Sequence, residues 1–315
     1  MTLYVVTGAN GFIGRHLVAS LVADGLAVRA LTRSLPEQSS AKGKVEWIAG
    51  DIADRDTWNR LLEPGCIVIN LAYTNVDADL SAIEATAHMM EACADANVAH
   101  LIHCSTVSVY GCLKEIVLDE ESKCNPLYHY GRVKLRLEQM LKEGVHDRFP
   151  VTIVRPSTVF GKGGETLMAL VDALANGKKV KNYLRSSLFG ARKTHLVPVE
   201  NVVAAIRFIA DFAAPHGVET FIVSDDDEPI NNFRDVEKLL MSELGLAPYP
   251  VAPLPVPRQL LELLLRLLKR SNYHVRTVYS SQKLIARGFV KVMDLETALR
   301  QFASDQKPCM AKDAA

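Results

Sequence analysis

A tyrosine and a lysine four positions apart are the residues of this sequence best suited to acid–base chemistry. Tyr130 and Lys134 lie in a stretch of helical character, and positions i and i+4 share one face of a helix. A neighbouring ammonium group favours the phenolate and lowers the tyrosine pKa, so that Tyr130 can exchange a proton with a substrate hydroxyl or carbonyl group. Thr106, at the end of an apolar run, can hydrogen-bond to the same oxygen. These three side chains form the predicted catalytic group.

A second tyrosine–lysine pair has the same spacing. Tyr110 and Lys114 follow the apolar run 100–104, and Gly111 between them disfavours an uninterrupted helix. Tyr130 lies instead within a helical stretch. The sequence therefore favours Tyr130 over Tyr110 as the proton donor or acceptor.

A glycine-rich turn opens the chain. Residues 7–14 read Thr-Gly-Ala-Asn-Gly-Phe-Ile-Gly, directly after the apolar run 3–6 and before apolar residues at helical spacing. Gly8 allows a sharp bend, Gly11 allows backbone to approach a pyrophosphate, and Gly14 allows the helix to pack close to the sheet. This strand–turn–helix context predicts dinucleotide binding, and the alternative is a glycine-rich turn without function.

The first half of the sequence alternates predicted strands and helices, which must position these residues. Repeated strand–helix units require a parallel sheet with right-handed crossovers, and ligands bind beyond the carboxyl ends of its strands. After the first unit, strands are predicted over 27–31, 45–48, 66–71, 100–104 and 151–154, with helices over about 78–96 and 128–141.

The second half is less regular, with helices predicted over 165–175, 202–212 and 233–244 and strands over 194–199 and 221–223. The fold class is therefore α/β, a Rossmann-type doubly wound parallel sheet with a smaller C-terminal substrate-binding lobe. The predicted division is a dinucleotide-binding domain over 1–156, to which 194–224 return, a lobe over 157–193 and 225–303, and a frayed polar tail over 304–315.

Composition excludes several classes of function. The 315 residues carry 36 basic and 36 acidic side chains, so there is no basic field to gather nucleic acid. The six cysteines form no Cys-x-x-Cys pair, which indicates a reduced cytoplasmic protein without a metal site. No apolar run approaches the ~20 residues of a membrane span, and Met1 leads directly into the first strand, so we expect no signal peptide.

One leucine-rich stretch leaves its environment open. Residues 260–268 read Leu-Leu-Glu-Leu-Leu-Leu-Arg-Leu-Leu and are followed by Lys269 and Arg270. A helix there can pack in the core, pack in a dimer, or lie on a membrane surface.

Several motifs together resemble one family. They are Thr7-Gly8-x-x-Gly11-x-x-Gly14, Asp51-Ile52, Asn70-Leu71-Ala72, Ser105-Thr106-x-x-Val109-Tyr110-Gly111, Tyr130-x-x-x-Lys134, Arg155-Pro156, the segment 195–201 and Lys283-Leu-x-x-x-Gly288-Phe289. In this order, and over about residues 1–300, they resemble the extended short-chain dehydrogenases/reductases, in the group of nucleotide-sugar epimerases, dehydratases and 4-ketoreductases.

The resemblance implies a role for each cofactor-binding position. The pyrophosphate would lie on the glycine turn, the adenine on Asp51 and Ile52, the middle of the cofactor on the 71–73 segment, and the nicotinamide half near Lys134 and the residues after Arg155. Strand-end packing is the simpler role for Leu71, Ala72 and Pro156, and both roles can hold. The implied set is Gly8, Asn10, Gly11, Phe12, Ile13, Gly14, Thr32, Arg33, Asp51, Ile52, Leu71, Ala72, Tyr73, Lys134, Pro156 and Ser157.

The end of the second strand bears on the choice of cofactor. NAD-preferring proteins usually carry an acidic residue there that bonds the ribose hydroxyls. This sequence has Thr32 followed by Arg33, and an arginine can pair with a 2′-phosphate. We therefore favour NADP(H), while NAD(H) stays possible if Arg33 is only an exposed loop charge.

Three reactions are associated with the family. Dehydratases carry Asp-Glu after the active-site threonine, where this sequence has Val107 and Ser108. Epimerases generally keep NAD bound, whereas reductases use and release NADPH. The expectation is an NADPH-dependent reductase of a 4-keto nucleotide sugar, with an NAD-dependent nucleotide-sugar 4-epimerase as the alternative. A reductase of another carbonyl compound and a non-catalytic cofactor-binding protein are the remaining alternatives.

The substrate-binding residues are the least defined. Arg185, Arg192 and Lys193 flank a predicted loop that could hold a diphosphate, or could simply be a solvated basic loop. Asn75, Ser108 and Thr158 are candidates for contact with the sugar. The resemblance also implies a homodimer through the long helices, among them 128–141.

Overall fold

The computed structural model describes residues 2–35, 45–73, 79–111, 113, 115–145, 148–212, 217–254, 256–257, 259, 267 and 277–313. The chain divides into two compact units. The sheet unit contains Met1–Val109, Tyr128–Arg155 and Val202–Phe221, and the second unit contains Tyr110–Leu127, Pro156–Asn201 and Ile222–Ala315. Compared with the predicted division, residues 110–127 belong to the second unit, and the returning segment is 202–221 rather than 194–224.

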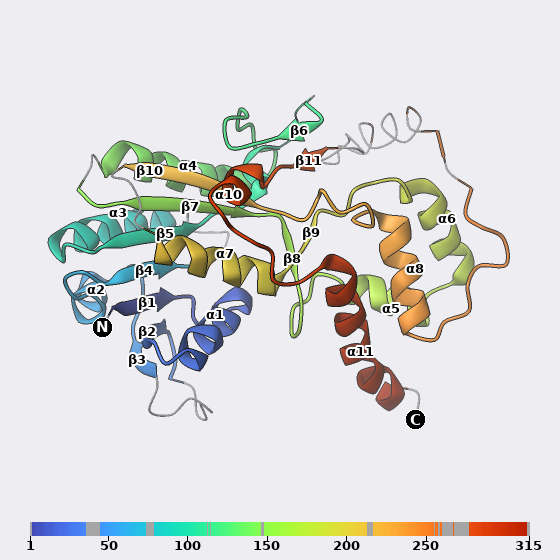
Figure 1. The fold of residues 1–315 in the computed structure, drawn as a ribbon, viewed down its shortest axis with the longest axis horizontal. Coiled ribbons are helices and arrows are strands. Elements are labelled where there is room, and N and C mark those ends of the chain that lie inside the picture. The colour runs from blue at the N-terminus through green and yellow to red at the C-terminus, as the bar shows by residue number, and fades with distance from the viewer. Residues whose placement is uncertain are drawn as a thin grey trace. The chain divides into compact units, whose positions relative to one another are not determined.

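The sheet has seven strands in the order β10-β7-β5-β4-β1-β2-β3 (Figure 1). Every strand pair whose register is described is parallel. This order confirms the predicted Rossmann-type α/β fold. The strands are β1 (Leu3–Thr7), β2 (Ala27–Thr32), β3 (Val45–Ala49), β4 (Ile67–Asn70), β5 (His100–Cys104), β7 (Val151–Pro156) and β10 (Val218–Val223).

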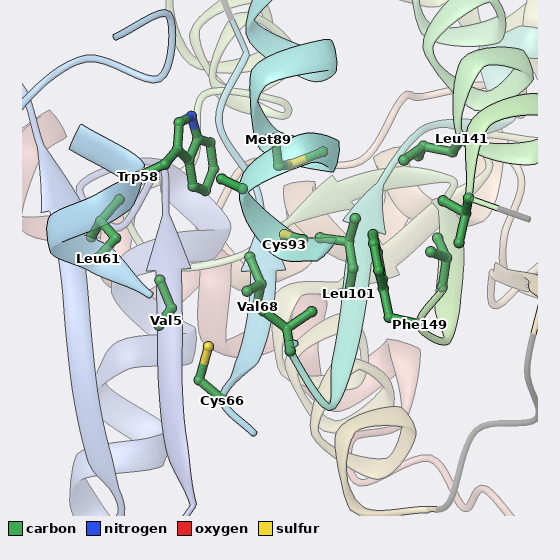
Figure 2. Packing of buried hydrophobic residues seen from close by; sticks show 14 of the residues in the cluster. Val5, Trp58, Leu61, Cys66, Val68, Met89, Cys93, Leu101, Leu141 and Phe149 are labelled. Atoms are coloured by element: carbon green, nitrogen blue, oxygen red, sulfur yellow. The ribbon is translucent and has the colours of Figure 1, made fainter. Parts of the chain in front are cut away.

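Helices pack against the sheet through apolar stripes. The helices α2 (Arg55–Leu61), α3 (Asp79–Asp95) and α4 (His129–Gly144) contribute to one buried cluster with β1, β4 and β5. Figure 2 shows Trp58, Met89 and Cys93 from these helices around Val68 and Leu101 of the strands. The helices α1 (Phe12–Ala23) and α7 (Val199–Asp211) are joined by a 2.7 Å hydrogen bond from Arg207 to Ser20.

The carboxyl ends of four neighbouring strands carry polar residues. Thr7, Thr32 and Asn70 end β1, β2 and β4, and Ser105 and Thr106 follow β5. All five are buried. The strands of a parallel sheet end on the same edge, so the fold gathers the residues predicted to do chemistry at one edge of the sheet unit.

The second unit is built around two short parallel sheets and its own core. β8 (Thr158–Phe160) pairs with β9 (Leu196–Pro198), and β6 (Val117–Leu118) pairs with β11 (Val278–Tyr279). The described residues of this unit form the helices α5 (Met168–Asn176), α6 (Lys179–Phe189), α8 (Phe233–Glu243), α10 (Gln282–Ala286) and α11 (Leu295–Asp313). Phe160, Leu170, Val236, Leu240 and Phe302 are among its buried residues.

Two predictions for this unit are corrected. The segment predicted as a basic loop contains the helix α6, because Asn182 and Ser186 face inward and are buried while its lysines point outward. The tail predicted from residue 304 continues as helix α11 to Asp313. Nearly all of the leucine-rich stretch 260–268 lies outside the described residues. None of the helices in the described ranges is long and apolar enough to cross a membrane.

Candidate cofactor and active site

The glycine turn between β1 and α1 is too tight for side chains. Gly8 has a φ of +66°, and a Cβ there would lie 2.7 Å from the carbonyl carbon of Leu71. A Cβ on Gly14 would lie 2.1 Å from the Gly8 oxygen. The first N–H groups of α1 have no acceptor within their own helix, and the helix dipole places positive charge at this end. The turn is therefore shaped to receive an anion such as a pyrophosphate.

A cleft of about 460 Å³ opens beside this turn. Its size and its position at the strand ends fit a dinucleotide. Ten of the predicted cofactor-binding residues line it: Gly8, Asn10, Gly11, Thr32, Arg33, Asp51, Ile52, Leu71, Ala72 and Tyr73. Phe12, Ile13 and Gly14 form the first turn of α1, where backbone N–H groups are the available donors.

The end of β2 is fixed by a buried hydroxyl. Asn10 donates a 2.7 Å hydrogen bond to Thr32 Oγ1, and the Thr32 hydroxyl donates to the Ser34 carbonyl oxygen at 2.6 Å. Thr32 is thus committed to holding the turn, while Arg33 is exposed at the rim of the cleft. Among the described residues that line the cleft, Arg33 is the one with a cationic side chain.

The three predicted catalytic residues lie in the sheet unit, on α4 and after β5. Lys134 Nζ donates to the Cys104 carbonyl oxygen at 2.8 Å and lies 5.0 Å from the centre of the Tyr73 ring. The Tyr130 ring meets the edge of the Tyr73 ring, with 5.1 Å between centroids. Thr106 is buried, and its Oγ1 lies 3.2 Å from both the hydroxyl and the amide nitrogen of Ser108.

The predicted direction of the Tyr130 pKa is wrong. Tyr130 is 37% exposed, so its desolvation is only partial. This desolvation raises the pKa of Tyr130, and the neighbouring Cys104 and Tyr73 raise it further. Lys134 directs its ammonium group to the Cys104 carbonyl oxygen. Burial lowers the pKa of Lys134. The protonated phenol is therefore the favoured form of Tyr130 in this structure.

Sequence reasoning missed a buried charged network next to these residues. Glu138 accepts hydrogen bonds from the Ser105 hydroxyl at 2.5 Å and from Arg155 Nε at 3.0 Å, and its other oxygen lies 2.5 Å from Arg155 Nη2. All three residues are nearly inaccessible to solvent. Glu138 follows Tyr130 and Lys134 at intervals of four on α4, so the network fixes the face that carries them. The four-residue spacing was the signal available in the sequence.

The second unit contains five of the remaining predicted residues, Pro156, Ser157, Thr158, Arg185 and Arg192. Ser157 donates its N–H to the Val223 carbonyl oxygen at 2.9 Å, and its hydroxyl is buried without a hydrogen-bond partner among the described residues. Thr158, which follows Pro156 and Ser157, is exposed, and its N–H bonds the His195 carbonyl oxygen at 2.8 Å.

The predicted diphosphate clamp is not gathered in one loop. Arg185 lies on α6, 5.7 Å from the centre of the Phe233 ring, and Arg192 lies in the turn after this helix. Lys193 Nζ is bonded to the carbonyl oxygens of Asp226 and Glu228. Ser108 lies in the sheet unit, and Asn75 lies outside the described residues.

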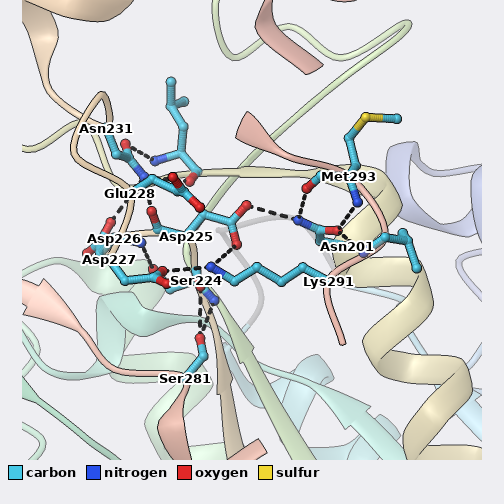
Figure 3. Close-up of polar contacts among 12 residues, drawn as sticks. Asn201, Ser224, Asp225, Asp226, Asp227, Glu228, Asn231, Ser281, Lys291 and Met293 are labelled. Atoms are coloured by element: carbon cyan, nitrogen blue, oxygen red, sulfur yellow. Dashed lines mark hydrogen bonds and ion pairs between the residues drawn. The ribbon is translucent and has the colours of Figure 1, made fainter. Parts of the chain in front are cut away.

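A second charged network, also missed, follows β10. Lys291 Nζ lies 3.2 Å from Asp225 and 2.7 Å from Asp227, and Asn201 donates to Asp225 at 2.9 Å (Figure 3). Burial raises the pKa of Asp225 to about 6, against the opposing effect of Lys291. The acidic run 225–228 after a strand was its signal in the sequence. In the described part of the chain no group of three or more His, Cys, Asp or Glu side chains could hold a metal ion.

The sequence matches the model of the NAD dependent epimerase/dehydratase family over residues 4–222. The match covers the glycine turn, the cleft and the Thr106, Tyr130 and Lys134 positions. The chain belongs to this family and is an NAD(P)-dependent oxidoreductase or epimerase of the extended short-chain dehydrogenase/reductase type.

Two relatives of this chain are named for different reactions. The chain is 28% identical over 307 residues to a dTDP-4-dehydrorhamnose reductase of Mycolicibacterium smegmatis, covering 94% of this chain and 83% of the relative. It is 26% identical over 268 residues to the N-acetyl-alpha-D-glucosaminyl-diphospho-ditrans,octacis-undecaprenol 4-epimerase of Escherichia coli O157:H7, covering 79% of this chain and 76% of the relative. Relatedness to reductases and epimerases of activated sugars is therefore clear.

Solved structures share the fold. A dTDP-glucose 4,6-dehydratase of Bacillus anthracis in complex with NAD gives a TM-score of 0.72 at 16% identity, covering 99% of this chain and 98% of that chain. A UDP-glucose 4-epimerase of Thermotoga maritima with UDP-glucose gives a TM-score of 0.68 at 20% identity, covering 98% and 100%. At these identities the likeness establishes the fold alone.

Proposed function

We propose that this protein is an NADPH-dependent reductase of a 4-keto nucleotide sugar. The observation that carries the proposal is the end of β2, where the buried Thr32 holds the turn and Arg33 lines the cofactor cleft. An arginine at this position complements a 2′-phosphate, whereas NAD-preferring sites usually place a carboxylate there. The relative named a dTDP-4-dehydrorhamnose reductase, which matches 94% of the chain, supports the reductase assignment.

The proposed reaction needs a proton donor beside the carbonyl oxygen. When bound, the nicotinamide cofactor supplies hydride for the carbonyl carbon. Tyr130 holds the proton that the oxygen receives, because its raised pKa keeps the phenol protonated at neutral pH. Thr106 provides a hydroxyl for the same oxygen, and the buried Lys134 cation offsets negative charge that develops there.

The alternative is an NAD-dependent nucleotide-sugar 4-epimerase. Its support is the relative named as a 4-epimerase, which matches 79% of the chain. An epimerase removes and returns hydride at one carbon, so Tyr130 would act as base and then as acid. The raised pKa of Tyr130 disfavours the phenolate that the base half of that cycle requires.

The cofactor preference separates these two functions. We expect the purified protein to bind NADPH at least tenfold more tightly than NADH and to be isolated without bound NAD. Arg33→Asp should abolish the preference, while Arg136→Asp, an equal change of charge on the exposed face of α4, should leave it intact. NAD that co-purifies, together with equal or tighter binding of NADH, would overturn the reductase in favour of the epimerase.

A further inference from the structure

A small cavity lies next to the cofactor cleft within the sheet unit. Its volume is about 20 Å³, and its lining consists of Ile52, Trp58, Asn70, Ala72, Tyr73, Ala82, Ala85, Thr86, His103 and Leu137. Three of these residues, Ile52, Ala72 and Tyr73, also line the cofactor cleft. The two spaces therefore share a wall.

A chain of hydrogen bonds leads from this wall to the cavity. The Ala72 N–H donates to Thr7 Oγ1 at 3.3 Å, and the Thr7 hydroxyl donates to Asn70 Oδ1 at 2.6 Å. Because the amide oxygen of Asn70 already accepts from Thr7, the amide nitrogen is the group that faces His103. It lies 3.1 Å from His103 Nδ1, which therefore accepts the bond.

This direction of bonding fixes the tautomer of His103. The residue is 1% exposed, and burial, with Lys134 nearby, lowers the pKa of His103 to about 3, so the ring is neutral. A neutral imidazole whose Nδ1 accepts must carry its hydrogen on Nε2. Nε2 is buried and finds no acceptor among the described residues. Buried N–H groups are rarely left unpaired in folded proteins, which calls for a partner other than a described protein group.

We propose that the cavity binds one ordered water molecule, which accepts a hydrogen bond from His103 Nε2 and donates one to Thr86 Oγ1. A volume of 20 Å³ exceeds the roughly 10–15 Å³ that a water needs, and a buried water needs at least two polar partners. The Thr86 hydroxyl donates to the Ala82 carbonyl oxygen at 2.8 Å, so its oxygen is left as an acceptor. The donor is His103, which lies on strand β5.

The water completes a continuous polar connection from α3 through β5, β4 and β1 to the Ala72 amide. Ala72 and its neighbour Leu71 also pack against Gly8, where a Cβ would lie 2.8 Å from the Ala72 nitrogen. The series of hydrogen bonds that ends in this water therefore holds the wall of the cofactor cleft in place against the glycine turn. Thr86 and His103 are positioning residues for the cofactor, and they act through Asn70, Thr7 and the backbone of Ala72.

The water and the tautomer can be observed directly. A crystal structure of the cofactor-bound protein at better than about 1.5 Å should show density for a water between His103 and Thr86. The ¹⁵N shifts of selectively labelled histidine, assigned with a His103→Gln variant, should show the hydrogen on Nε2 at neutral pH. A dry cavity, or a hydrogen on Nδ1, would overturn the proposal.

A matched pair of variants tests the positioning role. Thr86→Val removes the acceptor with little change of shape and should raise the dissociation constants of NADH and NADPH three- to tenfold. Thr86→Ser keeps the hydroxyl and should retain wild-type affinity. The control is Thr152→Val, which deprives another buried histidine of its threonine partner, His100 at 2.9 Å, near the amino end of β5.

The control should shift the unfolding midpoint while both dissociation constants stay at their wild-type values. The proposal is overturned by unchanged cofactor affinity in Thr86→Val, by equal weakening in the Thr86→Val and Thr152→Val variants, or by equal weakening in the valine and serine variants of Thr86.

Discussion

The two buried charged networks of this protein differ in how completely their charges are matched. In the sheet unit, Glu138 and Arg155 meet through two contacts, and their side chains are 0% and 1% exposed. In the second unit, Lys291 is shared between Asp225 and Asp227 and is itself 20% exposed. The first network is a closed, dry pair, and the second is a partly wetted cluster with more negative than positive charge (Figure 3).

The two networks hold their charges differently. Arg155 contacts both carboxylate oxygens of Glu138 through its Nε and Nη2 atoms. Asp225 shares the Lys291 cation with Asp227. Asp225 is also buried, and burial raises its pKa to about 6. The network beside Tyr130 and Lys134 thus keeps a fixed geometry, whereas the network behind β10 responds to pH. A site that must hold acid–base residues in place is served by the closed kind.

Breaking the closed pair should give the largest effect. Arg155→Met leaves Glu138 charged and buried without its cation, so we expect the free energy of unfolding to fall by about 3–5 kcal/mol. Urea denaturation at pH 7 measures it.

The double variant Arg155→Met/Glu138→Leu serves as the control for the charge itself. It removes both charges and should recover most of the loss, because an apolar pair of similar volume can replace a buried ion pair. A double variant as unstable as the single one would mean that packing, rather than the unpaired carboxylate, carries the effect.

The buried His100 of the sheet unit should have the next largest effect on the free energy of unfolding. Burial lowers the pKa of His100 to about 4, below its ordinary value of 6.5, so the folded state binds fewer protons than the unfolded state. This contribution is present above pH 6.5 and is lost as the pH falls toward 4. Relative to His100→Gln, the wild type should lose about 2 kcal/mol between pH 7 and pH 5, as urea denaturation at the two values would show. A constant difference between the two proteins would contradict it.

The sequence predicted the fold and brought together most of the residues that line the cleft, because both depend on local patterns. The glycine turn, the apolar strands and the residues at their carboxyl ends follow from spacing along the chain. Gly8, Thr32 and Asp51 lie in the cleft because parallel strands end on one edge of the sheet.

The electrostatic surroundings could not be predicted in the same way. The raised pKa of Tyr130 depends on its partial desolvation beside Cys104 and Tyr73, which are 26 and 57 positions away in the sequence. The pairing of Glu138 with Arg155 likewise depends on how α4 packs on β7. The spacing of Tyr130 and Lys134 placed both residues on one face of a helix. The spacing could not show that the Lys134 ammonium group, on a flexible side chain, donates its hydrogen bond to the Cys104 carbonyl oxygen.

Asp225 should show the opposite response to pH, and a smaller one. Its folded pKa of about 6 lies above the ordinary value of 3.8, so its contribution to stability is present below pH 3.8 and is lost as the pH rises through 6. Relative to Asp225→Asn, the wild type should therefore lose about 1 kcal/mol between pH 5 and pH 7. Denaturation of the two proteins at both values measures this, and a wild type that gains on the variant over this range would show that Lys291 dominates burial.

An exposed ion pair should give the smallest effect and marks the limit of the comparison. Arg300 contacts Glu296 at 2.6 Å and also pairs with Glu243, yet its side chain is 49% exposed. Water already solvates Arg300 and Glu296, so Arg300→Met should lower the free energy of unfolding far less than Arg155→Met does. The same chemical change as Arg155→Met is made here, so the ratio of the two losses measures what burial adds to an arginine–carboxylate pair. Equal losses at the two sites would mean that the closed network near Tyr130 owes its strength to contacts other than the desolvated charges.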